Sequence, residues 1–159
     1  MIDEITSGNI ENLLKMIPDD ACSLEKVILC NEGTVQTLLS VIFGVPIKVE
    51  VIYQHETNIN IIRWSRLVAE FTPDNVIQVC SAQSVITKSE CPEGFINGIL
   101  EANHGIGQLI SSIGLNTKRK LSMADSNKHT FSRAHIIEGI GQSSPSLRIC
   151  ITETFVKSV

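Results

Sequence analysis

The order of two hydrophobic periodicities along the chain constrains its fold more than any other feature. Stretches in which apolar and polar residues alternate, as half-buried strands require, fall into two groups of three. Helix-like stretches precede each group and do not separate one strand of a group from the next. Strands that alternate with helices would indicate a parallel sheet. The observed order instead predicts an α+β fold with an antiparallel sheet.

Turn residues divide the alternating stretches into six predicted strands. We expect one helix from Leu24 to Cys30 and another that begins after a cap at Thr34. Two more are expected, from Glu93 to Ala102 and from Gly105 onward. We find no internal repeat and no low-complexity segment in the sequence. The predicted strands cover residues 47–56, 61–71, 76–86, 117–124, 130–140 and 147–156.

The chain has 159 residues, 43% of them hydrophobic, which suits one compact domain with a core. We place that domain at residues 24–159, after an N-terminal helical extension at residues 1–23. The net charge of −4 disfavours nucleic-acid binding, and no apolar stretch reaches the roughly 20 residues of a membrane span. The acidic start of the chain lacks the features of a signal peptide, so we expect a cytoplasmic protein that does not bind membranes.

Residue spacing argues against a metal site. The five cysteines form no Cys-x-x-Cys pair, and the four histidines show neither His-x-His nor His-x-x-His spacing. The odd number of cysteines also gives no disulfide framework, which is consistent with a reducing compartment.

The last predicted strand carries an isolated carboxylate. Alternation places Glu153 on the same face as Leu147, Ile149, Ile151 and Phe155, which is the more apolar face of that strand. A carboxylate there is costly unless a partner compensates its charge. This favours a polar group inside a pocket, although a solvated position near the strand end is an equal alternative.

Among the arginines on predicted strands, we single out Arg66, Arg119 and Arg133. Each taken singly could be a solvated surface residue, but together with Glu153 they suit a pocket for a small anion that carries a hydroxyl group. The segment Gly105-Ile106-Gly107 begins a predicted helix, whose free N–H groups could face a carboxylate. It lacks the further residues of a phosphate-binding loop.

An ordered set of short motifs resembles the chorismate lyase-like superfamily, closest to its small branch in archaea, actinobacteria and cyanobacteria. The resemblance covers roughly residues 24 to 157. Its segments are Asn31 to Leu39, Val49 to Glu56, Arg66-Leu67-Val68, Ala82 to Ile86, Gly105 to Ile110, Ser132 to Ile136, and the closing Thr152-Glu153-Thr154-Phe155.

The resemblance implies one six-stranded antiparallel sheet with helices on one face and a closed internal pocket. It implies the activity of a chorismate lyase, which removes pyruvate from chorismate to leave 4-hydroxybenzoate without a metal or organic cofactor. The partner would be chorismate or another small aromatic carboxylate. Glu153 and Arg133 would then be catalytic, and the substrate would contact Arg66, Gln83, Gly105, Ile106, Gly107 and Arg119.

The sequence departs from the family pattern at two positions. Gln83 stands where the family carries an ionised side chain, and Gly105 replaces a proline. A neutral amide cannot supply the missing charge, and glycine makes the turn less preorganised. The same superfamily includes effector-binding domains of transcription regulators, so a non-catalytic module that binds a small aromatic carboxylate is the alternative.

Overall fold

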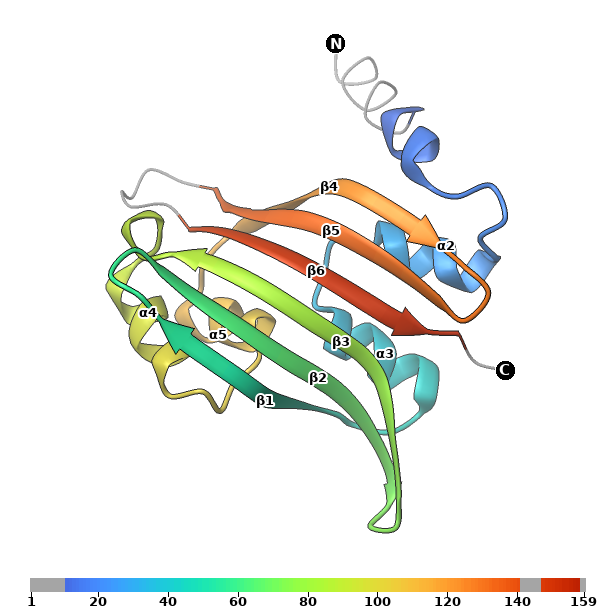
Figure 1. Cartoon of the computed structure of the whole chain (residues 1–159), viewed down its shortest axis with the longest axis horizontal. Coiled ribbons are helices and arrows are strands. Elements are labelled where there is room, and N and C mark those ends of the chain that lie inside the picture. The colour runs from blue at the N-terminus through green and yellow to red at the C-terminus, as the bar shows by residue number, and fades with distance from the viewer. Residues whose placement is uncertain (1–10, 141–146, 158–159) are drawn as a thin grey trace.

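The computed structural model describes residues 11–140 and 147–157. One antiparallel sheet in the order β1-β2-β3-β6-β5-β4 carries helices on one face (Figure 1). This confirms the α+β class, and each strand differs from its predicted bounds by two residues or fewer at either end. The strands are β1 (Ile47–Glu56), β2 (Asn60–Thr72), β3 (Asn75–Thr87), β4 (Thr117–Ser126), β5 (Thr130–Gly139) and β6 (Arg148–Val156).

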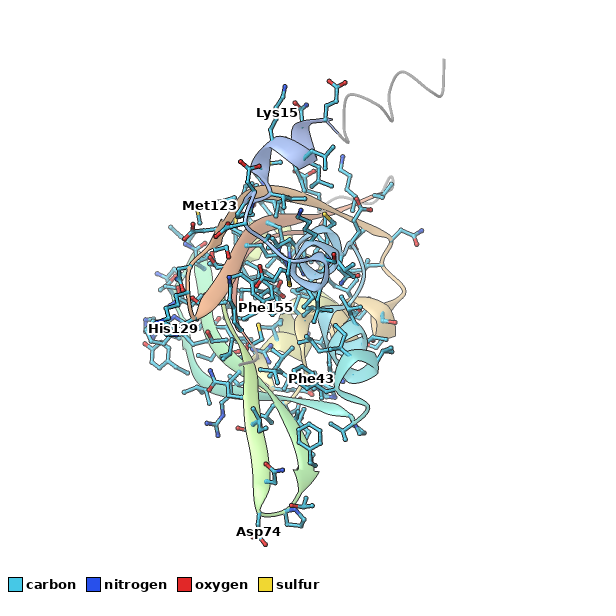
Figure 2. The ribbon with its side chains drawn as sticks, turned by 90° about the vertical axis from the view of Figure 1, so that its right-hand side faces the viewer. Lys15, Phe43, Asp74, Met123, His129 and Phe155 are labelled. Carbon is cyan, nitrogen blue, oxygen red and sulfur yellow. The ribbon has the colours of Figure 1, made fainter. Side chains whose placement is uncertain are left out.

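Four α-helices are arranged as two consecutive pairs, each followed by three strands. They are α2 (Ser23–Cys30), α3 (Val35–Phe43), α4 (Glu93–Leu100) and α5 (Ile106–Ile113), with a short 3-10 turn η1 (Lys88–Glu90) before α4. Residues 11–16 form a further helical segment. In the side view the helices gather on one side of the sheet, and the β2–β3 hairpin extends beyond them to Asp74 (Figure 2). No helix within the described residues is long and apolar enough to cross a membrane.

The structure contains an internal repeat of 70 residues that the sequence did not reveal. Helix α2 begins at Ser23 and α4 at Glu93, while β1 begins at Ile47 and β4 at Thr117. The helix pair of each half ends at a glycine with positive φ: Gly44 after α3, at 69°, and Gly114 after α5, at 73°. The pairing of β1 with β2 shifts register after Val51, and the pairing of β4 with β5 shifts after Leu121. Few residue types are shared between the halves, so the repeat lies in the backbone geometry.

The strand order makes the two halves equivalent in space. Strands β3 and β6 pair at the centre of the sheet, and β2 and β1 on one side match β5 and β4 on the other. The halves, coloured green and orange to red, are therefore related by an approximate two-fold axis that passes between β3 and β6 (Figure 1). Equivalent residues lie near each other only close to this axis.

Two hydrophobic cores lie on the helical side, one toward each end of the sheet. The core under α2 and α3 receives Phe131 and Phe155 from the second half, with their rings stacked at 4.9 Å. The core under α4 and α5 receives Ile61 and Ile86 from the first half. Strand register makes Ile61 equivalent to Phe131, and Ile86 to Phe155. Each core therefore depends on residues from both halves, and the axis passes between the cores.

Candidate functional site

A cavity lies near the two-fold axis, between the sheet and the helices. Its wall includes the start of α3 at residues 34–36 and the start of α5 at residues 105–107. The volume open to the centres of water-sized molecules is about 50 Å³, which is enough for a few water molecules or a compact ligand. Equivalent strand positions from the two halves complete the wall, as the pairs Val49 and Arg119, Ala82 and Ile151, and Ser84 and Glu153.

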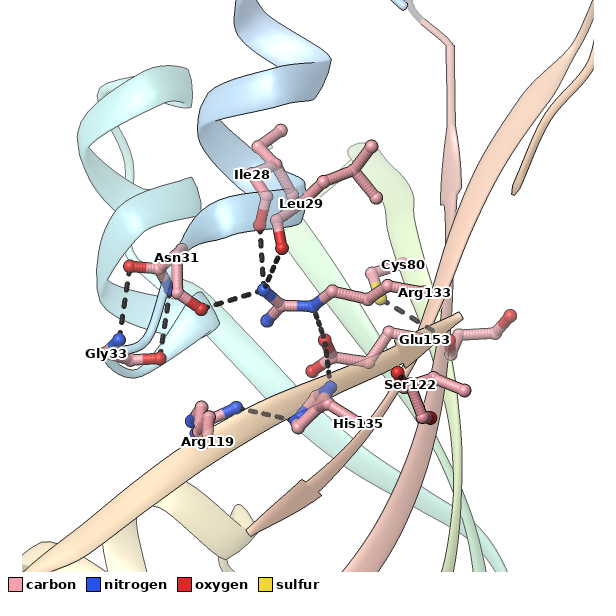
Figure 3. Close-up of polar contacts among 12 residues, drawn as sticks. Ile28, Leu29, Asn31, Gly33, Cys80, Arg119, Ser122, Arg133, His135 and Glu153 are labelled. Atoms are coloured by element: carbon pink, nitrogen blue, oxygen red, sulfur yellow. Dashed lines mark hydrogen bonds and ion pairs between the residues drawn. The ribbon is translucent and has the colours of Figure 1, made fainter. Parts of the chain in front are cut away.

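In the second half, a buried arginine forms an ion pair and contacts a helix end, while its Nη2 has no hydrogen-bond partner within the described residues. Arg133 Nε donates to Glu153 Oε2 at 2.6 Å, and the two residues are 2% and 4% exposed. Arg133 Nη1 donates to three carbonyl oxygens at the end of α2, from Ile28, Leu29 and Asn31 (Figure 3). The ion pair thus fixes the end of α2 to the sheet, and Arg133 lies behind Glu153 as seen from the cavity.

His135 joins this group in its neutral form. Burial, with added repulsion from Arg133 and Arg119, lowers the pKa of His135 to about 3. Arg119 Nη1 donates to His135 Nε2 at 2.9 Å. Because a guanidinium can only donate, Nε2 accepts and the ring proton lies on Nδ1. That Nδ1 is 3.8 Å from Glu153 Oε2 and has no hydrogen-bond partner within the described residues.

In the first half, the equivalent arginine is Arg63, and it is only partly engaged. Arg63 is 1% exposed, and its Nη2 donates to the carbonyl oxygen of His104, just after α4. Its Nε and Nη1 have no partner in the described part of the chain. The residue opposite Arg63 on β3 is Ser84, whereas Arg133 faces Glu153 on β6. Burial lowers the pKa of Arg63 to about 10, so it remains charged at neutral pH.

Two helices begin at the cavity and add to its positive potential. The first N–H groups of a helix have no intrahelical partner and carry partial positive charge. The starts of α3 and α5 are in close contact, because a Cβ added to Gly107 would lie 2.8 Å from Thr34 Cγ2. Glycine at residue 107 therefore allows both helix starts to reach the same small space.

The charges around the cavity do not balance. Arg63 and Arg119 line the cavity together with a single carboxylate, Glu153, and a third guanidinium group, that of Arg133, lies behind it. That carboxylate is bound to Arg133, and neither Arg63 nor Arg119 forms an ion pair within residues 11–140 and 147–157. Burial also lowers the pKa of Arg119, an effect that the attraction of Glu153 opposes. The arrangement therefore has two positive charges in excess and can accept an anion.

The predicted site residues divide between the two faces of the sheet. Glu153 and Arg119 line the cavity together with Gly105, Ile106 and Gly107. The parity of the last strand is confirmed, since residues 147, 149, 151, 153 and 155 are all buried.

Two predicted ligand contacts lie on the opposite, open face of the sheet. Arg66 forms an exposed ion pair with Glu50 at 2.6 Å, and Gln83 is exposed between Trp64 and Thr152. Their placement corrects our expectation, because neighbours on a strand point to opposite faces and the cavity side belongs to Arg63 and Ser84.

Sequence reasoning missed Arg63, the most deeply buried arginine of the site. The same argument that singled out Glu153 would have found it, because alternation places Arg63 on the face of Ile61 and Leu67.

Compared with known proteins, the sequence matches no protein-family model and no curated protein. Within the described residues, no group of three histidine, cysteine, aspartate or glutamate side chains is placed to hold a metal ion. The cavity itself, a small positively charged space closed by two helix starts, is the feature from which a function can be argued.

Proposed function

We propose that this domain binds a compact organic acid with two negative charges in the central cavity. The observation that carries the proposal is Arg63, which is 1% exposed and has two nitrogens without partners. Burying a charge without a partner is costly, and removing water from a guanidinium is offset only when good hydrogen bonds replace it. A ligand carboxylate on Arg63 would supply both the charge and the acceptor.

The charge and size of the cavity restrict the ligand. Arg63 and Arg119 are the two cationic groups without a carboxylate partner among the described residues, so a dianion would balance them. Carboxylates suit such a site because they accept charge-assisted hydrogen bonds from guanidinium and backbone N–H groups alike. A volume of about 50 Å³ favours compact acids.

Chorismate belongs to this class of ligand and connects the cavity with the family resemblance. It carries two carboxylates, as the excess of two positive charges requires. Its ring needs more space than the cavity offers, so binding would require the starts of α3 and α5 to move apart. Small dicarboxylates need no such movement and would bind as the cavity stands.

Chorismate lyase activity is a second candidate, favoured by the position of Glu153. Release of pyruvate from chorismate requires that a ring proton leaves and that the enolpyruvyl group is protonated. Glu153 lies in the cavity wall and can carry a proton. Its carboxylate is already held by Arg133 at 2.6 Å, so the binding function is the one that the geometry supports better.

Isothermal titration calorimetry with malonate, fumarate, 4-hydroxybenzoate and chorismate tests the proposal. The informative variants are Arg63→Gln and the matched control Arg66→Gln, which changes an arginine on the opposite face of the same strand. We expect Arg63→Gln to weaken binding of the dicarboxylates about tenfold or more, because it removes a charge-assisted hydrogen bond. Arg66→Gln should leave the affinity within about twofold. Equal affinities of the wild type and Arg63→Gln would contradict the proposal, as would a wild type that binds none of the four acids.

A coupled assay of pyruvate release from chorismate tests the second candidate. If the protein is a lyase, Glu153→Gln should reduce turnover by roughly 10²- to 10⁴-fold, measured where the variant is still folded. Binding of chorismate with no release of pyruvate would reject the lyase and retain the binding module.

A further inference from the structure

The internal repeat provides a template for how the ligand sits. We infer that a ligand carboxylate binds Arg63 in the place that Glu153 occupies on Arg133, and that Ser84 is the residue that keeps this place open. The inference rests on the proposed function and adds to it a position for the ligand and a residue that determines whether binding occurs.

The equivalence of the two places follows from strand register. Arg63 on β2 is opposite Ser84 on β3, and Arg133 on β5 is opposite Glu153 on β6. Both arginines are buried, at 1% and 2% exposure, and both point to the helical side of the sheet. The two places therefore share one backbone framework and differ in the side chain on the neighbouring strand.

The hydrogen bonds show which part of the arrangement is missing. Each arginine uses a terminal nitrogen to reach backbone carbonyl oxygens of the other half: Arg133 those of Ile28 and Asn31 at the end of α2, and Arg63 that of His104 before α5. Arg133 then uses Nε to bind Glu153, whereas Nε of Arg63 has no partner in the described residues. Both arginines thus contact the backbone of the other half, at positions that are not equivalent, and the carboxylate contact is absent in one.

The cavity supplies the space that the missing side chain would fill. Ser84 is 4% exposed and lines the cavity together with Arg63. A glutamate side chain has three more non-hydrogen atoms than a serine side chain, and its carboxylate would enter the open volume beside Arg63. Serine at this position therefore leaves the arginine free for a carboxylate that comes from outside the chain.

The test is to supply the missing carboxylate from the chain itself. We compare Ser84→Glu with the neutral control Ser84→Gln, which fills the same space, and with Ser84→Ala, which leaves the space open. Thermal unfolding is followed between pH 2 and pH 8, and binding of malonate and fumarate is measured by calorimetry on the full chain.

The expected result has two parts. Ser84→Glu should unfold at a higher temperature than Ser84→Gln at pH 7, and the difference should disappear as the pH falls, because an ion pair with Arg63 requires the ionised carboxylate. Ser84→Glu should also bind the dicarboxylates about tenfold or more weakly than Ser84→Ala, which leaves the place beside Arg63 open.

The outcomes separate this inference from the proposed function. If the wild type binds a dicarboxylate and Ser84→Glu is no more stable than Ser84→Gln, the inference is overturned and the binding function remains. If Ser84→Glu is stabilised yet binds as tightly as Ser84→Ala, the ligand carboxylate lies elsewhere, and the inference is again overturned. If the wild type binds none of the acids, the proposed function itself fails, whatever the stability of Ser84→Glu.

Discussion

Arg63 and Arg133 occupy equivalent positions in the two halves of the molecule, but the two halves treat them differently. Each arginine is buried, and each donates to backbone carbonyl groups of the other half. In the second half, Glu153 supplies a carboxylate partner, and the arginine becomes part of the framework. In the first half, Ser84 takes the place of the carboxylate, and a positive charge faces an open cavity. A duplicated framework can thus change from a structural ion pair to a binding position through one residue.

Replacing each arginine by methionine tests this contrast most strongly. Arg133→Met leaves the buried carboxylate of Glu153 without a partner, and we expect a loss of about 3–5 kcal/mol in the free energy of unfolding. Arg63→Met removes a charge that has no carboxylate partner, so the free energy should change by less than about 1 kcal/mol or increase. Urea unfolding of the two variants measures both values. Equal losses at the two positions would show that the halves do not differ in this respect.

The buried His135 of the second half should make stability depend on pH. The first half has Ser65 at the equivalent position, and a serine does not titrate. The pKa of His135 is about 3 in the folded protein, against roughly 6.5 in the unfolded chain. As the pH falls below about 6.5, the unfolded chain gains a proton that the folded protein does not. Stability should therefore fall by up to about 1.4 kcal/mol per pH unit, or roughly 2–3 kcal/mol between pH 6.5 and 4.5.

Urea unfolding at several pH values measures this slope. His135→Ser, which introduces the residue of the equivalent position, should have a shallower slope than the wild type. His129→Ser changes an exposed histidine and serves as the control. Parallel slopes for the wild type and His135→Ser would exclude a neutral buried His135.

The helix starts offer a smaller contrast, because Gly107 in the second half corresponds to Thr37 in the first. A Cβ at residue 107 would lie 2.8 Å from Thr34 Cγ2, so we expect Gly107→Ala to lower the free energy of unfolding by about 1 kcal/mol. Adding Thr34→Ser, which removes that methyl group, should recover the lost stability. Gly94→Ala, where nothing lies within 4 Å of the new Cβ, should instead stabilise the protein. Thermal unfolding of these variants provides the comparison.

The smallest effect is expected on the open face. Arg66 and Glu50 are about half exposed and form an ion pair at 2.6 Å. Solvent screens such pairs, so Arg66→Ala should change the free energy of unfolding by less than about 1 kcal/mol. Gln83→Ala should leave dicarboxylate affinity within about twofold. A larger effect of either variant on binding would indicate that the ligand binds on the open face of the sheet.

Much of the fold could be predicted because alternation and turn residues depend on local sequence. The six strands and the buried parity of residues 147–155 follow from that pattern. The internal repeat could not be predicted, because the halves share backbone geometry at Val51 and Leu121 but few residue types.

The site was predicted in part. Glu153 and the start of α5 were found because a carboxylate on an apolar face and a glycine pair before a helix are both visible in sequence. The placement of Gln83 could not be derived, since β3 is apolar on both faces: Val79 and Cys80 are both buried, and Val85 is exposed. Arg66 was singled out as a basic residue on a predicted strand without a choice between the two faces of that strand, although alternation places Arg63 on the apolar face.

The exchange of partners between halves has a consequence for how the protein unfolds. The arginine of each half holds a backbone segment of the other: Arg133 holds the end of α2, and Arg63 holds His104 in the loop between α4 and α5. Opening either half would withdraw the carbonyl groups that satisfy the arginine of its neighbour, and would also remove two side chains from the neighbour's core. We therefore expect that neither half is stable without the other. The two halves should unfold together in one cooperative transition.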